Sequence, residues 1–202
     1  MKTIFIDVET TGTNPQKHGI WQIGCIAVDE KEQVLGTFTD VMIPPKDVEW
    51  DKYVLDNMLP ESYKEKVKEN RVASSSSVFS TFIKWLDLHV NKYNIEDKFR
   101  FIAYNAKFDW DFTYAWAESH KFKYLGSYFF FPPFPVDVFA SYLIGNYRGK
   151  MKKFNLQAVC QHFGIGFVED EAHDAFYDIK KTQELWKYTQ KWLKIHTDLP
   201  RQ

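Results

Sequence analysis

The chain has 202 residues, of which 45% are hydrophobic and 18% aromatic, so it can bury the core of one ordinary domain. With 26 basic and 27 acidic residues its net charge is −1, which argues against a broad basic surface that coats nucleic acid. No signal peptide and no apolar run of membrane-spanning length is visible, and we expect a cytoplasmic protein without membrane attachment. Cys25 and Cys160 lie far apart in apolar segments, which is typical of buried free thiols.

The first part of the chain predicts strands joined by short links. Apolar and β-branched residues indicate strands at 3–8, 20–28 and 34–43. Their close succession favours an antiparallel meander. Helical periodicity follows over 47–68, where Pro60 breaks it into pieces. A four-serine run then leads into a predicted helix at 78–91.

The later part alternates strands and helices. A short strand at 99–104 passes through a turn into a helix that runs to about His120. The stretch 129–135 contains four phenylalanines and three prolines, and it fits either a buried strand or an aromatic stacking surface. One further long helix is predicted, at 173–196.

The segment from Gly145 to Lys153 carries four positive charges and is punctuated by two glycines. It lacks the Gly-Lys-Ser/Thr sequence of a nucleotide-binding P-loop. A solvated mobile loop and a flap that contacts phosphates are both consistent with this pattern.

Two acidic residues stand at the end of the first predicted strand. At strand periodicity Asp7 and Glu9 project from the same face, and a turn follows at once. Each carboxylate disfavours ionisation of the other unless a cation lies between them. A hard divalent cation is the simplest remedy, although two acids alone are also consistent with solvated surface charges.

Two more motifs follow the first. In chain order the three are Asp7-x-Glu9, Asn105-x-x-Phe108-Asp109 and His173-x-Ala175-x-x-Asp178. Together they resemble the DEDDh (DnaQ-like) family of 3′-to-5′ exonucleases over almost the whole chain. The resemblance implies an α/β, ribonuclease H-like three-layer fold, with a mixed central sheet of about five strands, the first three a meander, flanked by helices. We expect residues 1–202 to form a single exonuclease domain.

The resemblance also implies the site. The proposed metal ligands, for two divalent ions that are Mg²⁺ or its substitute Mn²⁺, are Asp7, Glu9, Asp109 and Asp178. His173 completes the catalytic set as the general base. The residues expected against the terminal nucleotide are Thr10, Thr11, Gly12, Asn105 and His173. Two positions depart from the family pattern, because Thr13 stands where many relatives carry leucine and Tyr104 replaces a common histidine.

Phosphodiester hydrolysis explains why such residues are needed. Two divalent ions about 3.5 to 4 Å apart stabilise charge on the phosphate oxygens and help to deprotonate a water. A histidine with an ordinary pKa near 6.5 can take that proton at neutral pH. His173 and Asp178 are five residues apart, so we expect His173 at the mouth of the last helix. Asp111 and Asp174 are neighbouring alternatives, but the motif register favours Asp109 and Asp178.

Three functional hypotheses stay open at this point. The first is a metal-dependent exonuclease that releases nucleoside 5′-monophosphates from single-stranded DNA or frayed 3′ ends. The second is the same chemistry on RNA or short oligoribonucleotides. The third is a non-catalytic nucleic-acid-binding or polymerase-partner module, against which the intact set of acids and histidine argues. A polymerase or repair protein is an expected class of partner.

Overall fold

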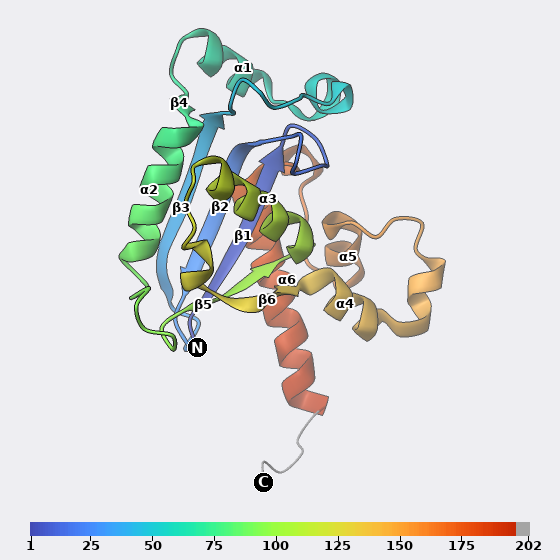
Figure 1. Cartoon of the computed structure of the whole chain (residues 1–202). Coiled ribbons are helices and arrows are strands. Elements are labelled where there is room, and N and C mark those ends of the chain that lie inside the picture. Colours follow the sequence, from blue (N-terminus) through green and yellow to red (C-terminus); the bar gives the residue numbers. More distant parts are fainter. Residues whose placement is uncertain (197–202) are drawn as a thin grey trace.

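The computed structural model describes residues 1–196, and these are organised around a six-stranded mixed sheet with the order β4-β3-β2-β1-β5-β6 (Figure 1). The strands are β1 (Thr3–Thr10), β2 (Ile20–Val28), β3 (Val34–Ile43), β4 (Ala73–Ser74), β5 (Phe99–Ala103) and β6 (Phe129–Pro135). The predicted meander is confirmed, because β2 pairs antiparallel with both β1 and β3. The sheet has one strand more than expected. The additional strand is β4, whose two residues are too few to show an alternating pattern.

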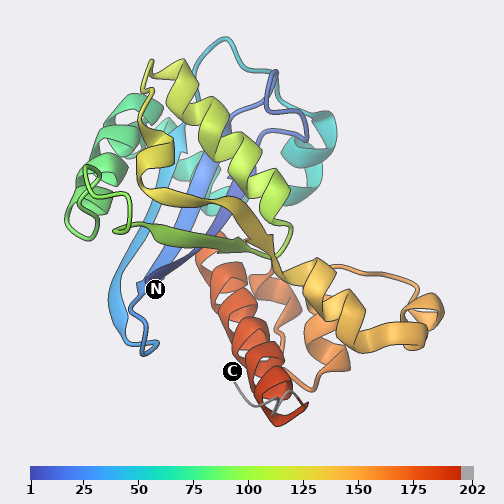
Figure 2. The ribbon, with the colours of Figure 1, turned by 60° about the horizontal axis from the view of Figure 1, so that its bottom comes forward.

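Helices cover both faces of this sheet. The α-helices are α1 (Glu61–Lys68), α2 (Ser75–Asp87), α3 (Ala106–Ser119), α4 (Val136–Ile144), α5 (Leu156–His162) and α6 (Ala175–His196). Short helical turns are η1 (Val54–Met58), η2 (Leu125–Ser127), η3 (Gly145–Lys150) and η4 (Glu169–Glu171). Figure 2 shows α2 and α3 on one side of the sheet and α4, α5 and α6 on the other. The predicted three-layer α/β architecture is therefore confirmed.

The two faces of β1 belong to different parts of the core. Ile4, Ile6 and Val8 are buried with the apolar sides of α2 and α3. Phe5 is buried on the opposite face, with residues of α4, α5 and α6. Because side chains alternate along a strand, Asp7 shares the Phe5 face. The acidic end of β1 therefore lies on the side of the sheet that α6 covers.

Two helices begin at other positions than predicted, and a side-chain cap explains each. α2 starts at Ser75 because the side chain of Ser74 accepts a hydrogen bond from the backbone N–H of Ser77. α6 starts at Ala175 because Asp174 caps it. Both caps use residue types that favour helix starts, but the surrounding sequence contains several equivalent residues.

The phenylalanine and proline stretch forms the edge strand β6. Phe129 is buried, while the side chain of Phe131 is 78% exposed. The strand pairs parallel with β5 on one side only. Proline lacks the N–H that a central strand must donate, so an edge is where prolines are tolerated. The prediction of a strand is confirmed, but the prediction that it is buried is wrong for all residues except Phe129, and the pairing continues through Pro135 instead of ending in a turn.

The two cysteines are buried free thiols, as predicted. Among residues 1–196, no helix combines the length and the apolar character needed to cross a bilayer.

Candidate active site

The carboxyl end of β1 presents the first two acids. Asp7 and Glu9 point to the face that α6 covers, and the Glu9 side chain is buried. The pairing of β1 with β2 shifts register between Glu9 and Thr10, so the regular strand ends there.

The start of α3 brings the third acid to the same place. β5 runs parallel to β1, so the carboxyl ends of both strands meet at one edge of the sheet. α3 begins three residues after β5 ends and carries Asp109 in its first turn. The backbone N–H of Val8 donates to Asp109 Oδ1 at 3.1 Å, which ties the carboxylate directly to β1.

The start of α6 supplies Asp178 and His173. The backbone N–H of His173 donates to Asp178 Oδ2 at 3.2 Å, so the residue before the helix folds back onto its first turn. Asp174 has a different role. Its Oδ1 accepts from the N–H of Tyr177 at 2.9 Å, and its Oδ2 accepts from Gln22 Nε2 at 2.9 Å. Asp174 thus caps α6 and attaches it to β2.

A glycine lets α6 approach the sheet at this point. Gly24 on β2 is the register partner of Asp7 on β1. A Cβ atom at Gly24 would lie 2.7 Å from the carbonyl oxygen of Ala175, well inside van der Waals contact. The absence of a side chain at Gly24 therefore determines how closely the start of α6 packs beside the acids of β1.

The four acids line one cavity with a volume of about 360 Å³. Of the residues predicted to contact a terminal nucleotide, Thr10, Gly12 and Asn105 also line it. Thr11 does not. Its hydroxyl is buried, donates to the carbonyl of Glu49 at 2.6 Å, and accepts from the N–H of Gly19 at 3.0 Å. Thr11 therefore holds the β1–β2 loop together from behind the cavity wall.

His173 lies at the rim of this cavity. Its backbone has a φ of +67°, a left-handed conformation that a residue with a side chain rarely adopts. Its imidazole is 58% exposed, and Nδ1 lies 4.0 Å from Glu9 Oε1. The predicted position at the mouth of the last helix agrees with this geometry, although His173 precedes the helix instead of opening it.

Burial and mutual repulsion make the acids reluctant to ionise together. The pKa values of Asp7 and Glu9 are raised well above their usual range, first by burial and then by the neighbouring carboxylates. Burial raises the pKa of Asp109 to about 8, against the opposing hydrogen bond from Val8. Burial also raises the pKa of Asp178 to about 6. A cation among them would remove this cost.

Comparison with known proteins identifies the family. A family model described as an exonuclease (RNase_T) matches residues 4–186, which is most of the chain. The chain belongs to this exonuclease family. The predicted DEDDh family and the predicted 3′-to-5′ exonuclease activity are thereby confirmed, together with the fold.

Individual relatives of the exonuclease are distant. It is 26% identical over 202 residues to a ribonuclease T from Histophilus somni (strain 129Pt), covering 95% of this chain and 84% of that protein. The structure resembles Escherichia coli Exonuclease I in complex with a dT13 oligonucleotide, with a TM-score of 0.72, 18% identity and 98% of this chain covered. The chain spans 42% of the length of Exonuclease I. It also resembles the nuclease domain of 3′hExo bound to rAMP, with a TM-score of 0.64, 16% identity, and 94% and 92% of the two chains covered.

The exonuclease brings residues to the cavity that its sequence motifs do not contain. Asp51 and Tyr53 line it from the segment before η1, and Val54 and Met58 line it from η1 itself. The N–H of Asp51 donates to the carbonyl of Thr11 at 2.7 Å, which holds this segment over the end of β1. The helical periodicity at 47–68 predicts helices here, but a lining role depends on tertiary contacts.

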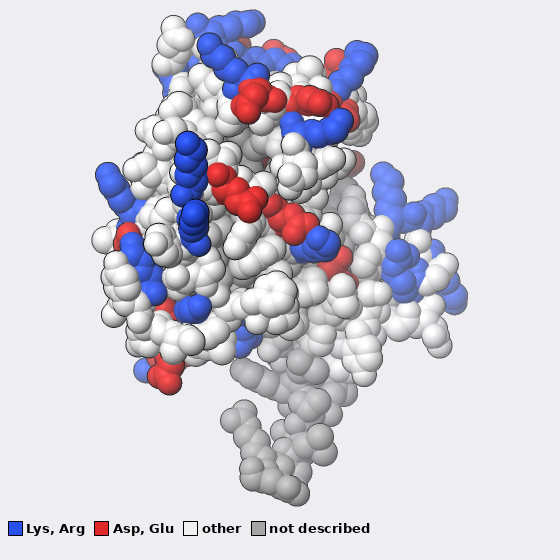
Figure 3. All heavy atoms as spheres, viewed as in Figure 1, with Lys and Arg blue, Asp and Glu red and all other residues white. Residues whose placement is uncertain are grey.

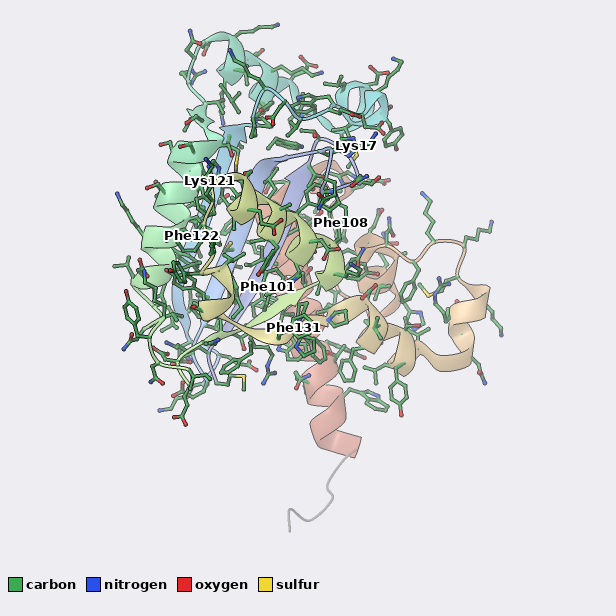
Figure 4. The ribbon with its side chains drawn as sticks, viewed as in Figure 1. Lys17, Phe101, Phe108, Lys121, Phe122 and Phe131 are labelled. Atoms are coloured by element: carbon green, nitrogen blue, oxygen red, sulfur yellow. The ribbon has the colours of Figure 1, made fainter. Side chains whose placement is uncertain are left out.

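An aromatic residue from the second motif completes the wall. Phe108 lines the cavity from the first turn of α3. Figure 4 shows Phe108 close to the end of β1. Its ring packs at a centroid distance of 4.8 Å against that of Phe112, which is buried in the core. The wall of the cavity is therefore continuous with the core of the sheet.

Asp111, two residues after Asp109, lies outside the cavity of the exonuclease. It forms an exposed ion pair with Lys107, one helical turn earlier. Of the two neighbouring alternatives, Asp174 is engaged in a cap and Asp111 in a surface pair. The structure brings together Asp109 and Asp178, the residues that the motif register favours.

The donor set of the cavity suits a divalent cation. One ligand atom from each of Glu9, His173 and Asp178 lies within 4.8 Å of the others. Among the described residues, Asp178 Oδ1 is buried without a hydrogen-bond partner. A buried anionic oxygen in this state is costly, and coordination to a hard cation would satisfy it.

A second hollow, of about 580 Å³, lies on the other side of the β1–β2 loop and contains none of the four acids. Three of its polar side chains bond to one another, because Trp116 Nε1 donates to Ser75 Oγ at 2.8 Å and Ser75 Oγ lies 3.2 Å from His120 Nε2. The smaller cavity therefore carries the chemistry that the exonuclease needs.

Proposed function

We propose that this exonuclease removes nucleoside 5′-monophosphates from the 3′ end of single-stranded DNA or of frayed duplex ends, using two divalent metal ions. The observation that carries the proposal is the convergence of four carboxylates in one cavity, with His173 at its rim. These acids come from β1, α3 and α6, and buried acids that repel one another support a cation site.

We propose Asp7, Glu9, Asp109 and Asp178 as the ligands of two Mg²⁺ ions, which Mn²⁺ could replace. When bound, such ions stabilise negative charge on the phosphate oxygens and lower the pKa of a coordinated water. The protein holds Asp109 in place through Val8 and Asp178 through the backbone of His173. Fixed carboxylates keep the site organised between turnovers.

His173 is the proposed general base. Its side chain is partly exposed, so it can exchange protons with solvent. Burial lowers its pKa, which keeps the imidazole neutral and able to accept a proton at neutral pH. Its location on the short segment before α6 places the imidazole beside the acids without making it part of the buried wall.

The proposed contacts of the terminal nucleotide follow from the cavity wall. Thr10, Gly12 and Asn105 line it and can approach a nucleotide. We also propose His173 as a contact, because it stands at the rim. We propose that Thr11 acts from behind, by holding the loop that carries Gly12.

RNA is the second candidate substrate. The ribonuclease T relative and the 3′hExo domain bound to rAMP favour it, whereas the Exonuclease I complex with dT13 favours DNA. One structural neighbour is an Exonuclease I complex with SSB-Ct, and we propose that this exonuclease also has a protein partner, of the polymerase or repair class.

A digestion experiment tests the proposal. Single-stranded DNA and RNA of the same sequence, labelled at the 5′ end, would be incubated with the enzyme in Mg²⁺, Mn²⁺ or EDTA. We expect a metal-dependent ladder that shortens from the 3′ end, and the faster polymer identifies the substrate. Absence of any degradation of either polymer in Mg²⁺ and Mn²⁺ would contradict the proposal and leave the non-catalytic module.

A further inference from the structure

The segment between α4 and α5 carries positive charge that the cavity does not use. Its basic residues are Arg148, Lys150, Lys152 and Lys153, and it contains no acidic residue from 145 to 153. Within the described part of the chain, none of the four forms an ion pair with a carboxylate. Figure 3 shows the segment at the right of the view as a group of Lys and Arg side chains with no acidic side chain among them.

The lysines of α1 lie among acidic residues, unlike those of the segment 145–153. On α1, Lys64 forms an ion pair with Glu61 at 2.6 Å, and Glu65 stands between Lys64 and Lys66. That arrangement is typical of a solvated helix face. The segment 145–153 differs because its charges form no ion pair with a carboxylate and are gathered in η3 and the residues directly after it.

Tyr104, in the wall of the cavity, bonds to the start of α4 before the segment and to Phe154 directly after it. Tyr104 lines the cavity. Its carbonyl accepts from the N–H of Asp137 at the start of α4, at 3.0 Å, and its hydroxyl donates to the carbonyl of Phe154 at 3.3 Å. The guanidinium of Arg148 stacks over the ring of Phe154, 4.1 Å from its centroid. Arg148 is close enough for its charge to lower the pKa of Tyr104, against the larger effect of burial.

Exposed aromatic rings accompany these charges. Tyr142 on α4 is 76% exposed and Tyr147 on η3 is 50% exposed. Large aromatic side chains left in solvent beside cations are the combination that binds single strands, because bases stack on rings while cations hold phosphates. The net charge of −1 makes such a local concentration of positive charge stand out.

We propose that the segment 145–153 holds the backbone phosphates of the substrate strand upstream of its 3′ terminus. This inference rests on the proposed function, because it takes the 3′ end to lie in the cavity. Lys150, Lys152 and Lys153 contact phosphates, and Arg148 fixes the segment against Phe154 and Tyr104. The segment therefore serves strands long enough to reach it and contributes little to a dinucleotide.

Two variants with equal charge changes test this. The first replaces Lys150, Lys152 and Lys153 with glutamine. The control replaces Lys84, Lys121 and Lys123, which are exposed and do not line the cavity, with glutamine. Figure 4 shows Lys121 on the far side of α3 from the segment. Binding of a single-stranded 20-mer is measured in EDTA across a series of salt concentrations, and turnover of the 20-mer and of a dinucleotide is measured in Mg²⁺.

Three phosphate contacts on a single strand correspond to a change of about 2 in the slope of log affinity against log salt. We expect the first variant to lose this much slope and to bind the 20-mer about tenfold or more weakly at low salt. Its KM for the 20-mer should rise with kcat unchanged, and the dinucleotide should be cleaved at the wild-type rate.

An unchanged salt slope, or a loss no greater than that of the control, would overturn the inference. Equal loss of activity on the 20-mer and the dinucleotide would also overturn it, because the defect would then lie in the cavity. If the wild-type enzyme cleaves neither substrate, the proposed function fails. The salt series in EDTA still tests whether the segment 145–153 binds phosphates, because it does not depend on cleavage.

Discussion

Asp109 and Asp111 are separated by one residue, yet their surroundings differ completely. Asp109 is buried and accepts a hydrogen bond from Val8, while Asp111 pairs with Lys107 on the surface. If the cavity acids bind metal, Asp109→Asn should lower kcat by more than about 100-fold. Loss of a residue that only orients a metal ligand costs up to about 100-fold, and loss of the ligand itself costs more. Asp111→Asn, the matched control, should keep activity within about twofold. Equal activity of the two variants in a steady-state assay would remove Asp109 from the ligand set.

The pH dependence of the rate tests His173. Burial lowers its pKa, so the neutral imidazole that can accept a proton forms at a lower pH than for an ordinary histidine. The rate at saturating Mg²⁺ should therefore rise as the pH increases and level off, with a midpoint below about 6.5. A second series at a higher Mg²⁺ concentration controls for metal occupancy. A midpoint that moves with the Mg²⁺ concentration would assign the profile to the carboxylates.

Substitution of His173 separates the roles of base and ligand, a distinction that its proximity to Glu9 and Asp178 makes necessary. His173→Ala should lower kcat by about 100-fold or more, the usual contribution of a general base. Mn²⁺ affinity, measured by titration, should stay close to that of the wild type. A parallel loss of metal affinity would make His173 a ligand.

At the residue scale, motif spacing predicted the acids that the structure brings together, because the spacing within each motif identifies one particular acidic residue. It could not predict Asp51 or Tyr53, which reach the cavity only because Asp51 is hydrogen-bonded to the β1–β2 loop. It also placed Thr11 against the nucleotide, whereas the structure buries its hydroxyl. Side-chain direction in a loop depends on long-range contacts that spacing does not contain.

At the element scale, the start of α6 depends on the sheet beneath it. Gly24→Ala would place a methyl group 2.7 Å from the carbonyl oxygen of Ala175. The nearest atoms all belong to the backbone of α6, so no flexible side chain can move aside to make room for it. We expect α6 to shift, and kcat to fall by about tenfold or more, because a small displacement of catalytic groups is costly. Gly126→Ala is the control, since a Cβ there meets nothing within 4 Å. Equal kcat values for the two variants would show that α6 accommodates the methyl group.

Long periodic elements were predicted well, and short or capped ones were not. The strands at 20–28 and 34–43 agree with β2 and β3 because alternation and apolar content extend over many residues. β4 was missed because a strand of two residues is too short to show an alternating pattern of apolar and polar side chains. The start of α6 was placed two residues early because the left-handed backbone of His173 cannot be read from its residue type.

At the scale of the whole molecule, the acids affect folding stability. The pKa values of Asp109 and Asp178 in the fold are about 8 and about 6, against about 4 in an unfolded chain. A group whose pKa is raised on folding contributes stability below its unfolded pKa and loses it as the pH rises through the folded pKa. The metal-free protein should therefore have a lower Tm at pH 8 than at pH 5.5, and Mg²⁺ should raise the Tm more at pH 8. The measurement is thermal unfolding in EDTA and in Mg²⁺.

Asp7→Asn provides the matched variant for that experiment. It removes one of the repelling carboxylates without changing the side-chain volume, so its metal-free Tm at pH 8 should exceed that of the wild type while activity is lost. A metal-free Tm that is lower than the wild-type value at pH 8 would show that Asp7 is stabilised in its charged form without a cation.

The overall architecture followed from the order of the three motifs. The resemblance predicted a three-layer fold, and the likeness to Exonuclease I over 98% of the chain agrees with it. The strand order could not be derived from local patterns, because the parallel pairing of β1 with β5 joins segments about 95 residues apart.

The most direct test of the central claim counts the metal ions. Free Mn²⁺ would be measured by its electron paramagnetic resonance signal during titration of the wild type, Asp7→Asn and the surface control Asp111→Asn, each with a saturating nucleoside 5′-monophosphate. We predict two bound ions for the wild type and for Asp111→Asn, and fewer for Asp7→Asn. Equal Mn²⁺ binding by all three proteins would contradict the assignment of the four acids as the metal centre of this exonuclease.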